Sequence, residues 1–406
     1  MNRLDAAIEA LKRGDMVILV DSEDRENEGD LVLAAQFATA EKINFLIRQA
    51  CGLVCLSLEA DQVERLALPP MVQENGSPRK TAFTVSVEAA RGVSTGISAA
   101  DRAHTILTAS NPSATRHDLV SPGHIFPLKA ARGGVLERAG HTEGSIELCK
   151  LAGLLPSAVI CEIINEDGSM ARKPDLERFS ERFGIPIVTI EDLIRHQISA
   201  SDWMDESRSA AFPNRHTPDD GRTWRIRSFR NRITGAEHAL LELDPKTGAS
   251  GAPLVRIHSE CLTGDALGSL RCDCGFQLDQ ALERIAADPA GGAVVYLKNH
   301  EGRGIGLFNK IEAYALQDDG RDTFDANVDL GFQPDARNYW DAVKMLTRAG
   351  MTRIRLITHN PAKAKELSEF GIRVEERVQL DARVTPENRR YLQTKRDRFS
   401  HDLGNV

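Results

Sequence analysis

Three cysteines stand close together in the second half of the chain. Cys261, Cys272 and Cys274 fall within fourteen residues. Thiolates are soft ligands that suit zinc, and a pair one residue apart can share an ion with a third thiolate brought back by a loop. Three protein ligands leave one coordination position open, which is typical of a catalytic zinc site. Two other interpretations stay open at this point, namely buried thiols or a structural site closed by His258.

An acidic segment in the first half could bind a harder cation. Residues 21–30 hold six carboxylates directly after the apolar run 16–20. Like charges at this density repel one another unless they are solvated or bound to a cation, and oxygen ligands suit magnesium or manganese. A solvated acidic surface loop is the alternative. Two histidines, His124 and His141, follow glycines in segments that we expect to be turns, and each alone is more often structural than catalytic.

Alternating strand and helix patterns must position these residues. In the first half, short apolar runs predict strands at 16–20, 52–58, 81–87, 158–164 and 185–190, with helical patterns at 40–50, 141–154 and 174–183 between them. In the second half we expect strands at 223–229, 238–243, 254–258, 293–297 and 353–358, and helices at 277–286 and 307–317. Residues 199–220 are rich in Ser, Asp and Pro without a sustained period, which predicts a linker. The fold class is therefore α+β, sandwich-like, with two domains of mixed sheets flanked by helices.

Length and composition limit the class of protein. The 406 residues exceed one ordinary hydrophobic core, so two domains are expected. A net charge of −8 gives no general attraction to nucleic acid or to anionic membranes. Leu4, Ile8 and Leu11 share one helix face where a signal peptide would be apolar throughout, and no apolar run approaches the roughly 20 residues that cross a bilayer. Seven cysteines without a bridge pattern favour a reducing compartment, so we expect a cytoplasmic protein.

Residues 221–406 resemble GTP cyclohydrolase II. The resemblance rests on Val-Arg-Ile-His-Ser-Glu-Cys-Leu-Thr-Gly-Asp at 255–265, Ser-Leu-Arg-Cys-Asp-Cys-Gly at 269–275 and Ala-Tyr-Ala-Leu-Gln-Asp at 313–318. It implies that Cys261, Cys272 and Cys274 bind zinc, and that a zinc-activated water attacks C8 of guanine so that formate and pyrophosphate leave GTP.

The same resemblance implies roles for other residues. Asp335 would accept a proton, Arg337 would engage the α-phosphate, and Tyr314 would assist at the zinc centre. The residues implied to bind GTP are Arg256, Ile257, His258, Ser259, Glu260, Gln277, Glu301, Gly302, Arg303, Thr323, Thr358 and Lys363. Arginine and lysine suit the charge of a triphosphate, and Gln or Glu can read the edge of guanine.

Residues 1–198 look like 3,4-dihydroxy-2-butanone 4-phosphate synthase. The likeness rests on the segments 23–30, 95–102, 122–128, 140–143 and 161–162. It implies conversion of ribulose 5-phosphate into the four-carbon ketone phosphate and formate, with magnesium or manganese on Glu26 and His141. His124 and Glu162 would be essential for proton transfers. The residues implied around the sugar phosphate are Arg25, Glu26, Asp30, Arg138, Ala139, Gly140, His141, Thr142 and Glu162.

Together the two resemblances predict a bifunctional enzyme of riboflavin biosynthesis that acts as a homodimer on small-molecule substrates, with no nucleic acid or membrane partner. The chain departs from the family patterns at Ser121, Glu312, Trp340 and His359. The departures at Glu312, Trp340 and His359 leave one alternative, in which only the first half is active and the second is a weakened or regulatory GTP-binding module. A zinc-containing nucleic-acid-binding protein is a further alternative, suggested by the basic run at 388–396.

Overall fold

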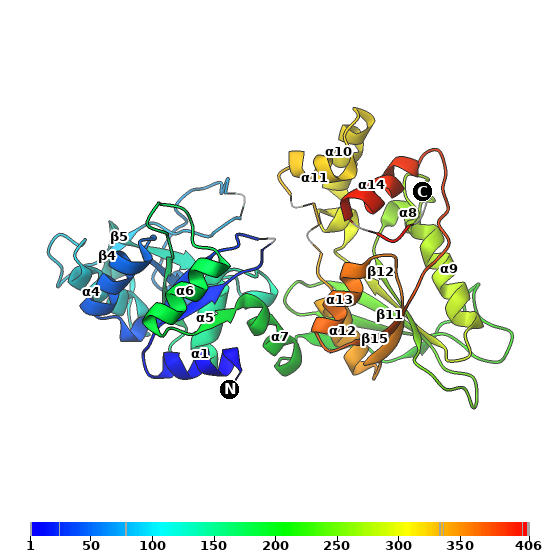
Figure 1. Cartoon of the computed structure of the whole chain (residues 1–406), viewed down its shortest axis with the longest axis horizontal. Coiled ribbons are helices and arrows are strands. Elements are labelled where there is room, and N and C mark those ends of the chain that lie inside the picture. Colours follow the sequence, from blue (N-terminus) through cyan, green and yellow to red (C-terminus); the bar gives the residue numbers. More distant parts are fainter. Residues whose placement is uncertain are drawn as a thin grey trace. The chain divides into compact units, whose positions relative to one another are not determined.

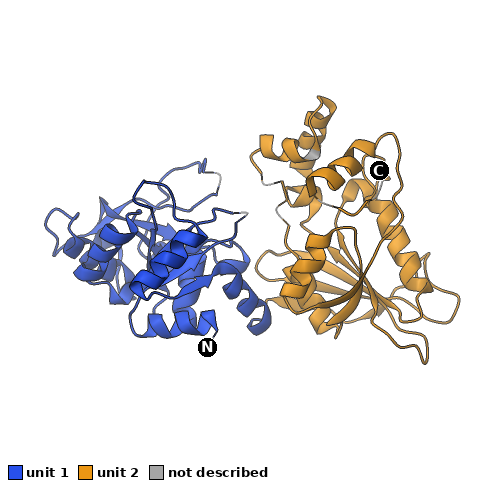
Figure 2. Ribbon diagram, viewed as in Figure 1, with its two compact units in different colours: residues 1–201 blue, residues 202–406 orange. Residues whose placement is uncertain are grey.

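The computed structural model describes residues 2–23, 25–77, 79–332, 334–335, 337–399 and 401–403. The chain divides into two compact units, residues 1–201 and 202–406 (Figure 2). Each unit is built on one large mixed sheet. Asp24 of the acidic segment lies outside the described residues.

Unit 1 contains a seven-stranded sheet in the order β4-β5-β3-β6-β2-β1-β7. The strands are β1 (Val17–Val20), β2 (Gly29–Ala34), β3 (Cys55–Leu58), β4 (Val87–Ala89), β5 (Leu119–Lys129), β6 (Ser157–Glu162) and β7 (Ile187–Thr189). β3 is parallel to β5 and β1 to β7, whereas the other neighbours are antiparallel. All six residues of β2 are buried, as expected for a central strand covered on both faces.

Helices cover both faces of this sheet. They are α1 (Arg3–Lys12), α2 (Ala40–Phe45), α3 (Ala60–Arg65), α4 (Ala99–Ser110), α5 (His141–Leu151), α6 (Lys173–Phe183) and α7 (Ile190–Ala200). Ile18, Leu31 and Leu33 belong to a core with residues of α2, α4 and α6, while α5 packs on the strands together with α1 and α7. Gly29 belongs at the start of β2 because a Cβ there would lie 2.6 Å from the Leu176 side chain of α6.

Unit 2 contains an eight-stranded sheet in the order β15-β14-β12-β13-β11-β10-β8, with β9 pairing beside β8 on β10. The strands are β8 (Met204–Glu206), β9 (Ala210–Ala211), β10 (Arg225–Asn231), β11 (Glu237–Leu243), β12 (Leu254–Ser259), β13 (Gly292–Leu297), β14 (Arg353–Ile357) and β15 (Arg373–Val378). β12, β13, β14 and β15 are parallel, so the carboxyl ends of these four strands meet at one edge. That edge is the usual position of ligand-binding groups in α/β sheets.

The helices of unit 2 form two groups (Figure 1). α9 (Cys274–Ala287) packs on the sheet through Ala281 and Ile285, which share a core with Trp224, and α12 (Trp340–Arg348) and α13 (Pro361–Glu369) accompany the parallel strands. The second group consists of α10 (Gly306–Asp318), α11 (Thr323–Asp329) and α14 (Arg389–Phe399), with the single turn α8 (Leu262–Asp265) close by. Among the described residues of both units, no helix is long and apolar enough to span a membrane.

The expected fold class, two domains with mixed sheets flanked by helices, is confirmed, but three local expectations are wrong. The run 81–87 makes only isolated bridges at Phe83 and Thr84, and the regular strand β4 begins at Val87. His124 lies inside β5 rather than in a turn. Residues 199–220 include β8 and β9, which pair with β10, because their backbone groups complete the edge of the second sheet.

Removing the Ile285 side chain tests the core of unit 2. Ile285 is fully buried, so Ile285→Ala should lower the free energy of unfolding of unit 2 by about 2–5 kcal/mol through lost burial and a cavity. Tryptophan fluorescence during urea unfolding reports on this unit alone, because all three tryptophans lie after residue 202. Val384→Ala, at an exposed position, should leave the midpoint unchanged, and equal stability of both variants would contradict the assigned core.

Candidate functional sites

The three cysteines of unit 2 come together in space. Their sulfur atoms all lie within 4.8 Å of one another, and the Cys261 and Cys272 sulfurs are 3.7 Å apart. Cys261 precedes α8, and Cys274 is the first residue of α9. Gly264 lets the loop close around them, since a Cβ at that position would lie 2.8 Å from the Cys272 sulfur. The fold thus brings three cysteines from a stretch of fourteen residues together as one compact group of sulfur ligands.

A buried cation accompanies these thiols. The Lys310 ammonium of α10 lies 3.2 Å from the Cys261 sulfur and donates a 2.9 Å hydrogen bond to Thr263 Oγ1. It also pairs with the Glu301 carboxylate, which accepts a hydrogen bond from the Leu262 amide. Thiol hydrogen bonds from Cys272 and Cys274, together with Lys310, hold the pKa of Cys261 well below its usual range. One sulfur therefore carries negative charge even before a metal ion is considered.

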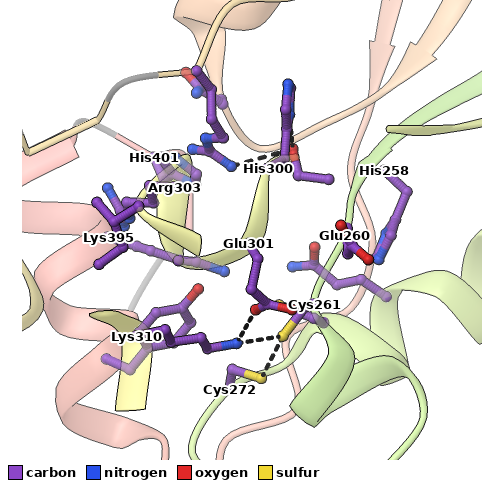
Figure 3. A pocket seen from close by; sticks show the side chains of 18 of the residues that line it. His258, Glu260, Cys261, Cys272, His300, Glu301, Arg303, Lys310, Lys395 and His401 are labelled. Carbon is purple, nitrogen blue, oxygen red and sulfur yellow. Dashed lines mark hydrogen bonds and ion pairs between the residues drawn. The ribbon is translucent and has the colours of Figure 1, made fainter. Parts of the chain in front are cut away.

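A polar pocket lies above the sulfur cluster, at the carboxyl edge of the parallel strands (Figure 3). Most of the residues predicted for GTP line it, namely Arg256, His258, Ser259, Glu260, Gln277, Glu301, Gly302, Arg303, Thr358 and Lys363, together with Tyr314 and Arg337. They arrive from β12 and the residue after it, from the loops after β13 and β14, and from α9, α10 and α13, while Arg337 comes from the segment between α11 and α12. The three cysteines complete the lining.

Two buried cationic groups in this pocket, Lys363 and Arg256, have no ion-pair partner among the described residues. Burial and the nearby Arg256 and Arg337 guanidinium groups lower the pKa of Lys363 well below its usual range. In the described part of the chain, Arg256 Nε, Arg303 Nη1 and His258 Nδ1 are buried without a hydrogen-bond partner. Buried charge without pairing is unfavourable, so this arrangement suits a polyanionic ligand.

Three residues predicted for this site are placed differently from the rest. Ile257 is buried in β12, where its carbonyl oxygen accepts a 3.0 Å hydrogen bond from Lys363 Nζ. Asp335 is bound by Arg337, whose Nε donates a 2.8 Å hydrogen bond to Oδ1. Despite burial, Arg337 lowers the pKa of Asp335 to about 2. Thr323 is the first residue of α11, and its side chain is outside the described part.

The departures from the family pattern near this site have local explanations. Glu312 is exposed on α10 and does not line the pocket. His359 lines the pocket, and its Nε2 lies 2.8 Å from the Leu380 carbonyl oxygen. Asp341, next to Trp340, lies 2.8 Å from His238 Nε2 and accepts a 3.1 Å hydrogen bond from the Trp203 indole. None of these contacts fills the pocket with a competing carboxylate.

Sequence reasoning missed residues that reach this pocket from distant positions. Lys310, Tyr391, Lys395 and His401 all line it. Lys310 follows the glycine-bearing segment by one helical turn, so its spacing carries a weak signal. The other three belong to the basic C-terminal run and its continuation, which suggested only the nucleic-acid-binding alternative. Only their packing on the pocket identifies them.

The candidate site of unit 1 lies along one edge of its sheet. The register pairs Asp30 of β2 directly with Glu162 of β6. Cys55 pairs with both Ile160 and Phe126, so His124 of β5 and Glu162 of β6 flank the same position, residue 53. Neighbouring strands lie about 4.8 Å apart, which separates the two backbone positions by about 10 Å. The Leu53 amide donates a 2.9 Å hydrogen bond to the Glu162 carboxylate, which fixes its orientation.

A second possible metal group lies in the same unit. Ligand atoms of Asp21, Glu26 and His141 lie within 4.8 Å of one another, with His141 Nδ1 3.6 Å from the Glu26 carboxylate. His141 begins α5 and is buried. Its Nε2 lies 4.0 Å from Asp30 Oδ1, and both of these buried atoms have no hydrogen-bond partner among the described residues. Asp21 is a member of this group that the sequence did not single out.

The charges of this group depend on each other. Burial raises the pKa of Asp30 to about 7. Burial alone would lower the pKa of His141, but the Asp30 carboxylate and the hydrogen bond to Glu26 outweigh it and raise the pKa to about 9. The same hydrogen bond holds the pKa of Glu26 near 2. At neutral pH the imidazole is therefore a cation among carboxylates.

The remaining predicted residues of unit 1 surround this group in separate contacts. Arg25 forms ion pairs of 2.9 Å with Asp21 and 2.8 Å with Glu26. Arg138 is paired with Glu143 at 2.8 Å, and Gly140 leaves the room for that pair, since a Cβ would lie 2.3 Å from the Arg138 guanidinium. Ala139 is partly buried, and Thr142 is buried in the first turn of α5.

His124 has a partner that the sequence did not indicate. Its Nδ1 is hydrogen-bonded to the carboxylate of Glu88 in β4, whose side chain is mostly buried. The His124 side chain itself remains 43% exposed. The carboxylate can therefore orient the ring while Nε2 stays accessible for proton transfer.

Comparison with known proteins identifies two family matches. The family described as 3,4-dihydroxy-2-butanone 4-phosphate synthase matches residues 5–196. The family described as GTP cyclohydrolase II matches residues 210–379.

Two curated relatives and one solved structure are similar over nearly the whole chain. The riboflavin biosynthesis protein RibBA of Salinispora arenicola is 48% identical over 400 residues, covering 98% of this chain and 94% of its own length. RibBA of Aquifex aeolicus is 47% identical over 402 residues, with coverage of 98% and 97%. The crystal structure of RibBX, a two-domain 3,4-dihydroxy-2-butanone 4-phosphate synthase from A. baumannii, matches with a TM-score of 0.70 at 34% identity, covering 94% of this chain and all 100% of that one.

Replacing Asp30 should change the titration of His141. Asp30→Asn removes the negative neighbour that favours the imidazolium, so the pKa of His141 should fall from about 9 toward its ordinary value of 6.5. The measurement is an NMR titration of histidine nitrogens in protein stripped of divalent cations with EDTA. Asp167→Asn, which alters an exposed loop, serves as the control. An unchanged His141 titration in Asp30→Asn would refute the coupling.

Proposed function

This chain belongs to the bifunctional riboflavin biosynthesis proteins of the RibBA family, and we propose which of its residues perform the two reactions of that family. It is both a 3,4-dihydroxy-2-butanone-4-phosphate synthase, a lyase, and a GTP cyclohydrolase II, a hydrolase. The relatives give no support to the alternative in which the second half is only a regulatory module. The synthase converts ribulose 5-phosphate to 3,4-dihydroxy-2-butanone 4-phosphate and formate. The cyclohydrolase converts GTP to a diaminopyrimidine ribosyl phosphate, formate and pyrophosphate.

We assign residues 1–198 to the synthase and residues 221–406 to the cyclohydrolase, with 199–220 between them. The family matches to residues 5–196 and 210–379 support a division into two domains, as do the two compact units, although the second match and the second unit both begin inside 199–220. The two strands in 204–211 belong by pairing to the second unit, so the connection itself is short.

The observation that carries the GTP assignment is the group of three sulfur ligands beneath a pocket that holds Arg256 and Lys363, two buried cationic groups without an ion-pair partner among the described residues. Cys261, Cys272 and Cys274 fit a zinc ion, because their sulfurs are mutually close and one of them is already anionic. Zinc held by three thiolates supplies Lewis acidity and an open position for water. The pocket cations and the sulfur group together give a place for the triphosphate and for the guanine ring that is opened.

Other residues of the pocket bind the phosphates of GTP and transfer protons. Arg337, with Arg256, Arg303 and Lys363, neutralises the phosphates, and Arg337 engages the α-phosphate. In the structure Arg337 occupies both oxygens of Asp335, so phosphate binding by the guanidinium frees the carboxylate to accept a proton. Tyr314 lies 3.1 Å from Thr263 Oγ1 and reaches the sulfur group from α10, where it can donate a proton as the ring opens.

The GTP contacts of the pocket extend along β12 and the neighbouring loops. We assign to them the predicted residues Ile257, His258, Ser259, Glu260, Gln277, Glu301, Gly302, Thr323 and Thr358. Support comes from the position of most of their side chains in one pocket at the carboxyl edge of the parallel strands. Ile257 contributes through its backbone.

In unit 1, Glu26 and His141 fit a divalent cation, magnesium or manganese. Asp21 lies within the same group. Asp30 Oδ1 and His141 Nε2 have no hydrogen-bond partner among the described residues, so both atoms are available to polar groups of a ligand. A hard cation held there polarises carbonyl and hydroxyl oxygens of the sugar. His141 would hold the cation as a neutral imidazole, so metal binding would be linked to release of the proton that the raised pKa of His141 otherwise retains.

Proton transfers in unit 1 fall to His124 and Glu162, which flank the same position at the sheet edge. Glu88 holds the ring of His124, and the Leu53 amide holds Glu162. Arg25, Asp30 and the turn formed by Arg138, Ala139, Gly140, His141 and Thr142 surround the sugar phosphate. The chemistry needs repeated enolisation, for which a histidine and a carboxylate on one edge are suitable.

We further propose that the chain is a homodimer in the cytoplasm. Leu307, Phe308 and Ile311 on α10 are 41%, 76% and 49% exposed, which favours an apolar contact with another copy. The seven cysteines are all free thiols, which fits a reducing compartment.

Loss of one cysteine should separate the two activities. Cys272→Ser removes a zinc ligand, so we expect loss of bound zinc and a fall in GTP opening on the order of a thousandfold, since Lewis acidity contributes several kcal/mol. Formate release from ribulose 5-phosphate should persist. Metal analysis and separate formate assays check both results, with the exposed Cys51→Ser as control. Unchanged zinc content in Cys272→Ser would overturn the assignment.

Neutralising Glu162 should have the opposite selectivity. Glu162→Gln removes a proton acceptor but keeps the size of the side chain, so kcat for ribulose 5-phosphate should drop by about 10²–10⁴-fold. GTP turnover should be unaffected. Glu166→Gln, four residues further on and exposed, is the matched control. Equal synthase rates in the two variants would remove Glu162 from the mechanism.

A further inference from the structure

The C-terminal helix α14 forms part of the nucleotide pocket. Tyr391 and Lys395 of α14, and His401 beyond it, line the pocket. Figure 3 shows Lys395 and His401 there. This segment follows residue 379, where the GTP cyclohydrolase II match ends. Its basic composition suggested nucleic-acid binding, yet Lys395 is only 8% exposed and Leu392 is fully buried. A buried lysine requires an anionic partner, and the identity of that partner indicates its role.

The partner is Asp273, which stands between two of the zinc-binding cysteines. Lys395 Nζ donates a 2.6 Å hydrogen bond to Asp273 Oδ1. Gln277 Nε2 donates a 2.6 Å hydrogen bond to Asp273 Oδ2, and Arg256 Nη2 donates one of 2.6 Å to Gln277 Oε1. All four side chains are at most 8% exposed. The contacts thus form one buried series from α14 to β12.

This series fixes the orientation of two groups that face the ligand. Because the Gln277 amide nitrogen is bound to Asp273, its oxygen must point to Arg256, and the amide cannot turn over. Arg256 is held additionally by a 3.1 Å hydrogen bond to the Ile357 carbonyl oxygen. Without Lys395, Asp273 would be a buried carboxylate without a cationic partner, and Arg256 is the nearest cation of the series that could replace it.

Other contacts keep α14 on the pocket. The Arg303 guanidinium lies 3.5 Å from the centre of the Phe399 ring. The Asp402 amide donates a 2.8 Å hydrogen bond to the His359 carbonyl oxygen, and the Asp402 carboxylate pairs with Arg377 at 2.6 Å. These anchors come from the loop after β13, the loop after β14 and β15. The segment is therefore fastened on several sides of the pocket.

Resting on the proposed cyclohydrolase function, we propose that Lys395 is a positioning residue for GTP. It neutralises Asp273 and so holds the Gln277 amide and the Arg256 guanidinium in the orientation that binds the nucleotide. The C-terminal helix is consequently a wall of the GTP site and not an independent tail. Lys395 acts through Asp273 and Gln277, and it does not itself take part in the chemical step.

The test compares Lys395→Met with Arg389→Met, which alters an exposed residue of the same helix. Lys395→Met should raise KM for GTP about tenfold, equivalent to 1.4 kcal/mol, while kcat changes less than about threefold. Lys395→Arg keeps the charge and the donors, so it should restore most of the affinity. Bound zinc and the synthase activity of the same chain should stay at the level of Arg389→Met.

Each of the other outcomes tests either the positioning role of Lys395 or the proposed function. An unchanged KM in Lys395→Met, or loss of zinc that accounts for the defect, would overturn the positioning role. If Lys395→Met unfolds unit 2 by tryptophan fluorescence, Lys395→Gln keeps a donor to Asp273 and should show the rise in KM in a folded protein. Absence of GTP turnover in zinc-loaded wild type would count against the proposed function instead. Calorimetric binding of GTP to wild type and Lys395→Met would then test Lys395 on its own.

Discussion

Burial of charge is the constraint on which both sites depend. Unit 2 places Cys261, Glu301 and Asp273 away from solvent, and each is tolerated because a cation lies against it. Lys310 is the cation beside Cys261 and Glu301, and Lys395 is the cation beside Asp273. A buried ion pair contributes little net stability, but removal of one partner is costly, so these contacts fix geometry more than they stabilise the fold. The cations without such partners, Lys363 above all, leave the pocket prepared for an anion.

Buried charge also needs compensation in unit 1, where several carboxylates surround one cationic side chain. Carboxylates of Asp21, Glu26 and Asp30 gather around one imidazole, and the proton on His141 is the charge that makes the group tolerable without a metal ion. A divalent cation provides the same compensation more strongly. A proton and a divalent cation would therefore compete for the His141 imidazole. Binding of the cation would then depend on the protonation of the residues that bind the sugar.

Sheet geometry explains why these charged residues meet. In unit 2 the carboxyl ends of β12, β13 and β14 bring residues 260, 298 and 358 to one edge, although nearly a hundred residues separate the first from the last. In unit 1 the register of β2, β3, β5 and β6 aligns Asp30, Glu162 and His124 in one row. The helices on both faces exclude water from the strands and leave the edges as the places where polar groups can gather.

The sequence by itself determined the chemical groups, the fold class and the family. Local periodicity predicted many of the strands and some of the helices but missed β2, β5 and α4. The spacing of Cys261, Cys272 and Cys274 predicted a sulfur site, because that signal lies within a short stretch of chain. The predicted turn at His124 was wrong, because a strand that contains glycine and proline resembles a turn when its partner strands are unknown. Only the tertiary structure decided that Glu88 holds His124, that Lys310 accompanies the thiols, and that Lys395 lies against Asp273. These contacts join positions that are distant or unremarkable in sequence, and they form because a buried charge must find its partner wherever the fold brings one close.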